Sequence, residues 1–232
     1  MENNDKPILL FDWDGTVVNS NDYKLDEAWR LTFQGEPERE QKIIEILNRP
    51  IGRQLYRYAL IAMVIFETDP EQKDLEGVGN NDEWIREDER ITKYSNRFAE
   101  LLKDHTKIPP FEDSKKVLEE LKNRGYKMYV VSGAGKEDIM QQANMHGLTE
   151  YFKEIYANDD SKPGHFEAIK ILEGIDDPEK YIVIGDGPVD LTFAETIKSR
   201  FIGLPNRFNS WSKEGSDFEV IDNLSELLAL LD

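Results

Sequence analysis

The sequence of 232 residues contains no cysteine, so a disulfide-bonded scaffold and catalysis by a thiolate are both excluded. It also contains no apolar run that approaches the length of a membrane span. Its first residues are polar and acidic, unlike the basic and apolar start of a signal peptide. We therefore expect a cytoplasmic protein with no membrane partner.

Positive charge is also scarce. Lysine and arginine number 29 against 47 aspartates and glutamates, which gives a formal net charge of −18. Such a chain repels the phosphates of nucleic acids unless it has a dense basic cluster, and the sequence shows none. We expect no nucleic acid partner and a monomer or a homodimer. A small phosphorylated molecule remains compatible with this charge, because its site needs positive charge only locally.

Apolar residues make up 39% of the chain and are concentrated in short runs, which favours buried strands over disorder. From Ile108 onward such runs alternate with stretches of helical periodicity. This alternation predicts an α/β fold, with a Rossmann-like parallel sheet core flanked by helices. The predicted strands are Ile8–Phe11, Tyr126–Val131, Glu154–Ala157 and Tyr181–Ile184, with Arg200–Leu204 and Phe218–Ile221 as edge strands. The predicted helices are Ser114–Arg124, Lys136–His146, Gly164–Leu172, Val189–Lys198 and Leu224–Leu231.

Residues 20–105 have a different pattern. Apolar and aromatic side chains recur there at helical spacing, and only Met63–Phe66 is ambiguous between helix and strand. Glu67–Asp82 contains the turn formers of a loop. We therefore predict an all-helical cap domain at 20–105, inserted after the first strand of a core domain formed by 1–19 and 106–232.

The first candidate site residues are Asp12 and Asp14, which follow the strand Ile8–Phe11. A strand projects residues i and i+2 to the same side, so both carboxylates can face one site. Gly15 then lets the chain turn away. Two such carboxylates can divide the roles of nucleophile and proton carrier around one metal ion. On these residues alone, an ordinary solvated Asp-Gly turn is an equal alternative.

A second candidate follows the strand Tyr126–Val131, because ligands bind beyond the carboxyl ends of parallel strands. Ser132 and Gly133 supply a hydroxyl and backbone N–H groups that can bind an anion. A plain serine cap with a glycine turn is the commoner alternative. The segment is neither a P-loop nor a dinucleotide fingerprint, since Glu137 and Asp138 stand where those motifs need other residues.

The last two candidates lie at predicted helix starts. Lys162 opposes the helix dipole there, which is explained if its ammonium reaches an acidic or phosphate-bearing site. A solvated surface lysine is the commoner alternative. Asp186 and Asp190 stand four residues apart, a spacing that can bring both to one face. They could equally serve only to satisfy the helix dipole. Together with the first acid pair they would form an oxygen-rich pocket that favours Mg²⁺.

All four candidates lie at the ends of different predicted strands, and their order resembles that of the haloacid dehalogenase-like hydrolases. The resemblance covers nearly the whole chain. The matching motifs are Asp12-x-Asp14-Gly15-Thr16, Ser132, Lys162-Pro163 and Gly185-Asp186-x-x-x-Asp190.

The resemblance implies a role for each site residue. Asp12 would attack phosphorus, and Asp14 would protonate the leaving oxygen and then activate water. Mg²⁺ would be held by the Asp12 carboxylate, the Asp14 backbone carbonyl and Asp186, with support from Asp190. The residues implied to hold the phosphoryl oxygens are Ser132, Gly133 and Lys162.

Two features indicate a branch of the family. The dehalogenases lack an acid at the position of Asp14, so its presence implies phosphoryl transfer. The long gap between Thr16 and Ser132 resembles the phosphoglycolate phosphatase-like and β-phosphoglucomutase-like branch, whose helical cap lies there. The implied function is a Mg²⁺-dependent phosphatase for a small phosphorylated metabolite, phosphoglycolate-like or a sugar phosphate. A phosphomutase is the alternative, and the intact acid set argues against a catalytically silent binding protein.

The cap is expected to select the substrate. The segment Asn48–Arg53 interrupts the helical pattern, and its two cations, Arg49 and Arg53, could meet a carboxylate or second anion of the substrate. Pairing of these arginines with the many nearby acids is at least as good an interpretation.

Overall fold

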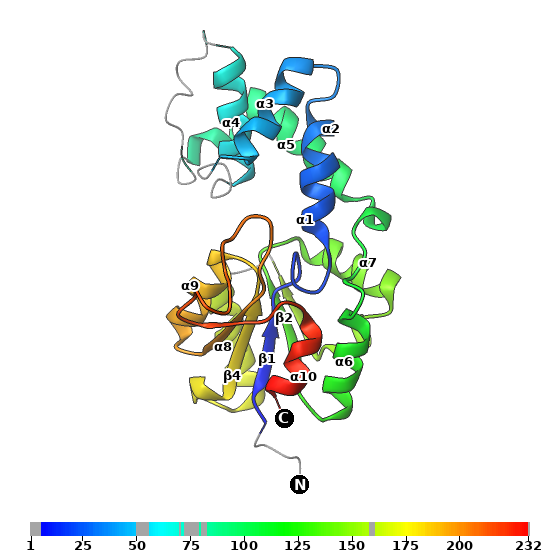
Figure 1. Cartoon of the computed structure of the whole chain (residues 1–232), viewed down its shortest axis with the longest axis vertical. Coiled ribbons are helices and arrows are strands. Elements are labelled where there is room, and N and C mark those ends of the chain that lie inside the picture. The colour runs from blue at the N-terminus through cyan, green and yellow to red at the C-terminus, as the bar shows by residue number, and fades with distance from the viewer. Residues whose placement is uncertain are drawn as a thin grey trace. The chain divides into compact units, whose positions relative to one another are not determined.

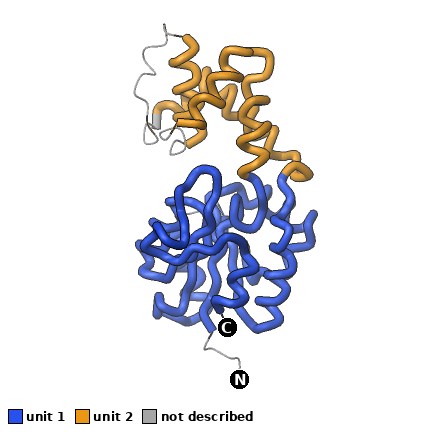
Figure 2. Tube along the Cα trace, viewed as in Figure 1, with its two compact units in different colours: residues 1–20, 108–232 blue, residues 21–107 orange. Residues whose placement is uncertain are grey.

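The computed structural model describes residues 6–49, 56–69, 71, 79, 83–157 and 161–231. The chain divides into two compact units (Figure 2). The first comprises Met1–Ser20 and Ile108–Asp232, and the second comprises Asn21–Lys107. The boundaries predicted from the sequence lie after residues 19 and 105.

The first unit contains a six-stranded sheet in the order β3-β2-β1-β4-β5-β6, in which every neighbouring pair is parallel. The strands are β1 (Ile8–Phe11), β2 (Met128–Ser132), β3 (Glu154–Ala157), β4 (Tyr181–Gly185), β5 (Arg200–Gly203) and β6 (Glu219–Val220). The central strands β1, β2 and β4 are buried along their whole length, which explains their unbroken apolar sequences. The predicted α/β fold with a parallel sheet is confirmed.

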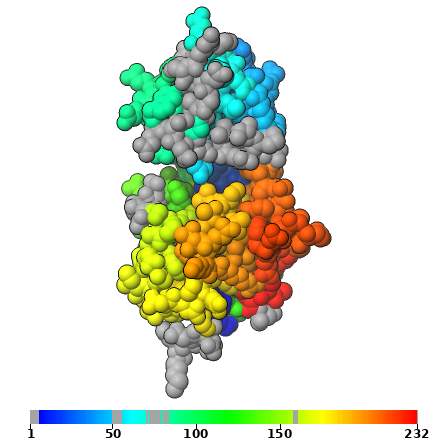
Figure 3. All heavy atoms as spheres, turned by 90° about the vertical axis from the view of Figure 1, so that its left-hand side faces the viewer, coloured from blue at the N-terminus to red at the C-terminus, as the bar shows by residue number. Residues whose placement is uncertain are grey.

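Helices cover both faces of this sheet. They are α6 (Ser114–Asn123), α7 (Lys136–His146), α8 (Lys162–Glu173), α9 (Pro188–Ile197) and α10 (Leu227–Leu230). In Figure 1, α8 and α9 lie on one side of the strands, and α6, α7 and α10 lie on the other. Figure 3 shows α8 and α9 in yellow and orange on the outer surface of this unit. Phe166 of α8 and Phe193 of α9 pack with Leu10 and Val183 in one buried cluster.

One strand prediction is wrong. Arg200–Leu204 was expected at an edge, but β5 lies between β4 and β6, so the edges are β3 and β6. Its short length and exposed Arg200 suggest an edge, whereas Phe201 and the residues after it are buried. The rings of Trp211 and Phe218 pack edge-on against Phe201, with centroids 5.6 Å and 5.0 Å away. Trp211 and Phe218 come from the connection between β5 and β6.

In the described residues of the second unit, every regular element is a helix. Its first helical run consists of α1 (Ser20–Tyr23), which starts at the end of the first unit, a π-helical turn (Lys24–Ala28) and α2 (Trp29–Thr32). The others are α3 (Pro37–Leu47), α4 (Arg57–Thr68), α5 (Glu89–Leu102) and the 3₁₀ turns Glu83–Arg86 and His105–Lys107. The ambiguous segment Met63–Phe66 lies within α4, which also takes in the first residues of the predicted loop Glu67–Asp82. Most of that loop lies outside the described residues. Across the described parts of both units, no helix is long and apolar enough to span a membrane.

The carboxylate of Glu173 links β2 to α8 from inside the first unit. Its side chain is 2% exposed and accepts hydrogen bonds from Lys127 Nζ at 2.6 Å, Lys153 Nζ at 2.8 Å and the Tyr129 hydroxyl. Burial by itself raises the pKa of Glu173. The hydrogen bonds from these three donors outweigh that effect and lower the pKa to about 2. Because this value lies below that of an unfolded glutamate, the network stabilises the fold above pH 4.5, and this contribution is lost as the pH falls through 2.

We therefore expect Glu173→Gln to lower the free energy of unfolding by about 1–3 kcal/mol at pH 7. The difference from the unsubstituted chain should shrink as the pH falls toward 2, because the native carboxylate then becomes neutral as well. Urea unfolding at pH 7 and pH 3 measures both effects. Glu167→Gln, which removes an exposed carboxylate from the same helix, is the control. Equal losses for the two variants would contradict a special contribution of Glu173.

Candidate active site

The candidate site begins where β1 ends. The backbone N–H of Asp12 donates to Ile184 O at 2.8 Å, so Asp12 continues the pairing of β1 with β4 by one residue. The chain then turns at Gly15, whose φ of 76° is a conformation that favours glycine. The turn is closed by a hydrogen bond from Gly15 N to Val18 O at 2.8 Å, and Asp14 forms an isolated bridge with Val18. Asp12 is thereby held at the carboxyl edge of the sheet.

Lys162 connects three of the predicted motifs. Its Nζ donates to Asp12 Oδ1 at 2.8 Å and to Asp190 Oδ1 at 2.5 Å. The three side chains are nearly buried, with exposures of 11%, 11% and 5%. Ser161 caps α8 by accepting from Gly164 N at 3.2 Å, which fixes the helix start that carries the lysine. A lysine at this helix start is therefore explained by the acids that it reaches.

The carboxylates of Asp12, Asp186 and Asp190 form a cluster. Each offers one oxygen, and these oxygens all lie within 4.8 Å of one another. Asp186 and Asp190 are 8% and 3% exposed, and Asp190 Oδ2 also accepts from Gly187 N at 3.0 Å. One lysine does not balance three buried carboxylates, and an all-oxygen donor set suits a hard divalent cation. The residues present therefore fit a metal ion such as Mg²⁺.

The charges of this cluster shift its protonation. Burial is the main cause that raises the pKa of Asp12, and the negative charges of Asp190 and Asp186 add to it. Lys162 opposes this rise, and the resulting pKa is about 7. Burial lowers the pKa of Lys162, but the carboxylates of Asp12 and Asp190 raise it by more, so the ammonium stays protonated. Without a second cation, burial and the neighbouring acids thus favour the protonated form of Asp12. A divalent cation would favour its ionised form.

Gly185 leaves the space that Asp190 occupies. A Cβ at Gly185 would overlap the Cβ and Cγ of Asp190, so Gly185→Ala must displace that side chain from Lys162 and from the cluster. We expect about tenfold weaker Mg²⁺ binding and a fold about 1–3 kcal/mol less stable. Calorimetric titration and urea unfolding measure the two effects. Gly133→Ala is the matched control, since a Cβ there meets nothing within 4 Å. Unchanged Mg²⁺ binding in Gly185→Ala would show that Asp190 does not support the ion.

The remaining predicted residues are placed as follows. Ser132 is the last residue of β2, beside β1, and its buried hydroxyl accepts from Ala134 N at 3.3 Å. The carboxylate of Asp14 is not among the three that form the cluster. In the second unit both terminal nitrogens of Arg49 bind the carboxylate of Glu67, one of them at 2.8 Å. Arg53 lies outside the described residues.

Two further residues at the site were missed in the sequence analysis. Asn206 Nδ2 donates to the carbonyl oxygen of Asp186 at 2.8 Å and to its Oδ2 at 2.7 Å. Asn209 Nδ2 donates to the same carbonyl at 2.9 Å. Both asparagines belong to no recognised motif. Their position just after β5, at the carboxyl edge of the sheet, was the one available signal.

Comparisons with known proteins agree with this arrangement. A family model described as haloacid dehalogenase-like hydrolase matches residues 7–197. The chain is 27% identical over 237 residues to the protein assigned as pyrophosphatase PpaX of Clostridium perfringens, covering 97% of this chain and 96% of that protein.

Among solved structures, one assigned as a phosphoglycolate phosphatase from Lactobacillus delbrueckii subsp. bulgaricus matches with a TM-score of 0.72 at 19% identity, covering 97% of this chain and 98% of the other. The haloacid dehalogenase-type hydrolase YfnB of Bacillus subtilis, determined with bound magnesium, matches with a TM-score of 0.64 at 17% identity. That match covers 98% of this chain and 99% of the other. At these identities the two structures show the shared fold.

Proposed function

Because this chain belongs to the haloacid dehalogenase-like hydrolases, we propose that it is a Mg²⁺-dependent phosphatase acting on a small phosphorylated metabolite. One observation carries the proposal. Lys162 contacts Asp12, whose carboxylate forms a cluster with those of Asp186 and Asp190. In this proposal Asp12 is the nucleophile, Lys162 neutralises the phosphoryl group, and the acid cluster holds the ion, all at one edge of the sheet.

Each residue has a proposed role in a two-step reaction. A carboxylate oxygen of Asp12 forms a bond to phosphorus while the bond to the leaving oxygen breaks, and Asp14 gives that oxygen a proton. Asp14 then takes a proton from water, which attacks phosphorus, releases inorganic phosphate and restores Asp12. Lys162, the Ser132 hydroxyl and the Gly133 N–H hold the phosphoryl oxygens in both steps.

The ion site has a supporting role. Asp12, Asp186 and the backbone carbonyl of Asp14 would hold Mg²⁺, and Asp190 would support it. The bound ion supplies positive charge against the phosphoryl oxygens and the three carboxylates. The magnesium in the structure of YfnB is consistent with this assignment.

The substrate is proposed to be a small phosphorylated anion. Phosphoglycolate-like compounds and sugar phosphates follow from the branch that the chain resembles. The name of the Clostridium perfringens relative adds inorganic pyrophosphate as a candidate. All of these present a terminal phosphoryl group that the same residues can transfer to Asp12.

A phosphate-release assay tests the proposal. The panel comprises inorganic pyrophosphate, phosphoglycolate, sugar phosphates and nucleoside monophosphates, each with Mg²⁺ and with excess chelator. We expect release that depends on Mg²⁺ and is strongest for one member of the panel. Release that continues unchanged in chelator would contradict the proposal. Conversion of one sugar phosphate into another without release of phosphate would instead identify a phosphomutase.

A further inference from the structure

The connection between β5 and β6 reaches back to the metal-site aspartate Asp186. Asn206 donates through Nδ2 to both the carbonyl oxygen and Oδ2 of Asp186, at 2.8 Å and 2.7 Å. Asn209 donates through Nδ2 to the same carbonyl at 2.9 Å and to Leu204 O at 3.0 Å. Asp186 is thus held by its main chain and by its side chain at once.

Each asparagine is in turn held by the connection itself. Asn206 Oδ1 accepts from Phe208 N at 2.6 Å and from Asn209 N at 3.0 Å. Asn209 Oδ1 accepts from Asn206 N at 3.2 Å and from Trp211 N at 3.2 Å. A side-chain amide can donate two hydrogen bonds and accept two, and both asparagines use all four. Their amide groups therefore have one orientation, with the donors toward Asp186.

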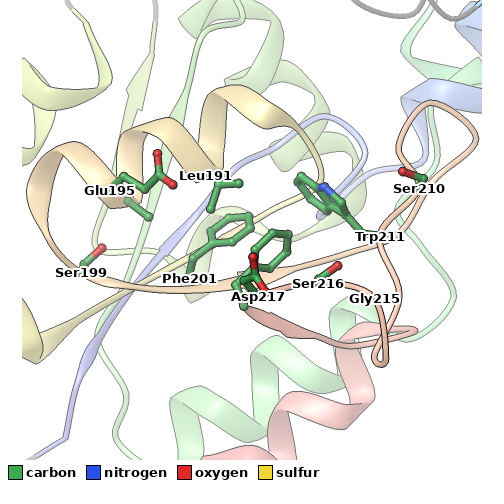
Figure 4. Close-up of a pocket in the computed structure, with 11 residues that line it drawn as sticks. Leu191, Glu195, Ser199, Phe201, Ser210, Trp211, Gly215, Ser216 and Asp217 are labelled. Carbon is green, nitrogen blue, oxygen red and sulfur yellow. The ribbon is translucent and has the colours of Figure 1, made fainter.

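The far end of the connection is anchored by aromatic packing. Trp211 packs edge-on against Phe218, with ring centroids 5.1 Å apart, and both contact Phe201 of β5. Trp211 and Phe218 also line a pocket of about 490 Å³ beside α9 (Figure 4). The segment that carries the two asparagines is thus tied to Asp186 at one end and to the sheet at the other.

We infer that Asn206 is a positioning residue for the divalent ion. Asn209 holds Asn206 in place by donating its backbone N–H to Asn206 Oδ1. By donating to Oδ2, the Asn206 amide fixes the rotation of the Asp186 carboxylate. Hydrogen bonds of this kind to a ligating carboxylate orient it for the metal, and their loss typically weakens metal binding about ten- to a hundredfold. The inference rests on the proposed function only in taking Mg²⁺ as the ion.

The test is calorimetric titration of the full chain with Mg²⁺ in the absence of substrate. Asn206→Leu has a similar size and lacks the donor, and we expect its Mg²⁺ affinity to fall about ten- to a hundredfold. Phosphate release by this variant should need correspondingly more Mg²⁺, while kcat at saturating Mg²⁺ stays near that of the unsubstituted chain. Asn223→Leu is the matched control, since Asn223 only caps the 3₁₀ turn Leu224–Glu226.

A second variant tests the inference even if Asn206→Leu does not fold. Asn206→Asp keeps the oxygen that accepts from Phe208 N and Asn209 N, so the turn is preserved, but it sets an oxygen against Asp186 Oδ2. The added negative charge by itself would tighten Mg²⁺ binding, whereas loss of the donor weakens it. We expect weaker binding.

The outcomes separate the inference from the proposed function. Equal or tighter Mg²⁺ binding in Asn206→Asp, or unchanged affinity in a folded Asn206→Leu, overturns the inference and leaves the phosphatase proposal standing. Absence of Mg²⁺ binding by the unsubstituted chain overturns both.

Discussion

Asp12→Asn is expected to reduce phosphate release by at least about 10⁴-fold, because a side-chain amide cannot form the bond to phosphorus that the proposed first step requires. The same substitution is expected to make the metal-free protein more stable at pH 8. A single change would then abolish turnover and strengthen the fold, a combination that general damage to the structure does not produce.

The sign of the stability change follows from the charge cluster. Burial and the neighbouring Asp190 raise the pKa of Asp12 from its ordinary 3.8 to about 7. Between these values the folded chain binds more protons than the unfolded chain, so the contribution of Asp12 to stability falls as the pH rises from about 4 through 7. Asparagine carries no charge and avoids this cost. We expect a gain of about 2–4 kcal/mol at pH 8 in chelator, and none at pH 4.

Urea unfolding at pH 4 and pH 8, with chelator and with Mg²⁺, tests this expectation. Mg²⁺ should stabilise the unsubstituted chain more than Asp12→Asn, because only the former offers it a carboxylate at this position. Asp222→Asn, at an exposed aspartate that pairs with Lys213, is the control and should change stability by less than about 0.5 kcal/mol. If Asp12→Asn is active, Asp12 is not the nucleophile. If the variant is less stable than the unsubstituted chain in chelator at pH 8, the pKa of Asp12 is not raised in the fold.

The sequence was sufficient to predict the residues that lie directly at strand ends. Asp12, Ser132 and Asp186 each come within a residue of the end of a buried apolar run, and parallel strands bring their carboxyl ends to one edge of the sheet. Lys162 was proposed because a cation at a helix start is unfavourable unless something nearby compensates it, and in the structure it contacts Asp12 and Asp190. In these cases a short sequence pattern, together with the rule that parallel strands end at one edge of the sheet, determines where the side chain lies.

The residues that escaped prediction depend on how irregular segments fold. Asn206 and Asn209 reach Asp186 through a turn that they themselves stabilise, and neither helical nor strand periodicity records such a turn. β5 is interior because β6 pairs with it, and Trp211 from the same connection packs on Phe201 of β5. Arg49 was predicted from its sequence context, but which acid it pairs with is decided by the packing of the second unit, where it contacts Glu67.

Lys162→Met is expected to lower the stability of the fold by a large amount, and the size of this loss should depend on whether Mg²⁺ is present. Lys162 is the ammonium that contacts the acid cluster, with its Nζ 2.8 Å from Asp12 and 2.5 Å from Asp190. Its removal leaves nearly buried carboxylates facing one another, and breaking such a buried pair costs about 3–5 kcal/mol. We expect this loss in chelator at pH 8. It should shrink as the pH falls, because protonation of Asp12 then relieves the repulsion.

Mg²⁺ should restore much of the lost stability of Lys162→Met, because the ion supplies positive charge to the same carboxylates. It should not restore turnover, since the phosphoryl oxygens still lack the ammonium; a fall in kcat of about 10²–10³-fold is expected even at saturating Mg²⁺. Thermal unfolding with and without Mg²⁺ and a phosphate-release assay measure the two effects. Lys122→Met, which removes an exposed ion pair with Glu150, should change neither. Recovery of full activity with Mg²⁺ would mean that Lys162 only balances charge in the metal-free fold and takes no part in holding the phosphoryl group.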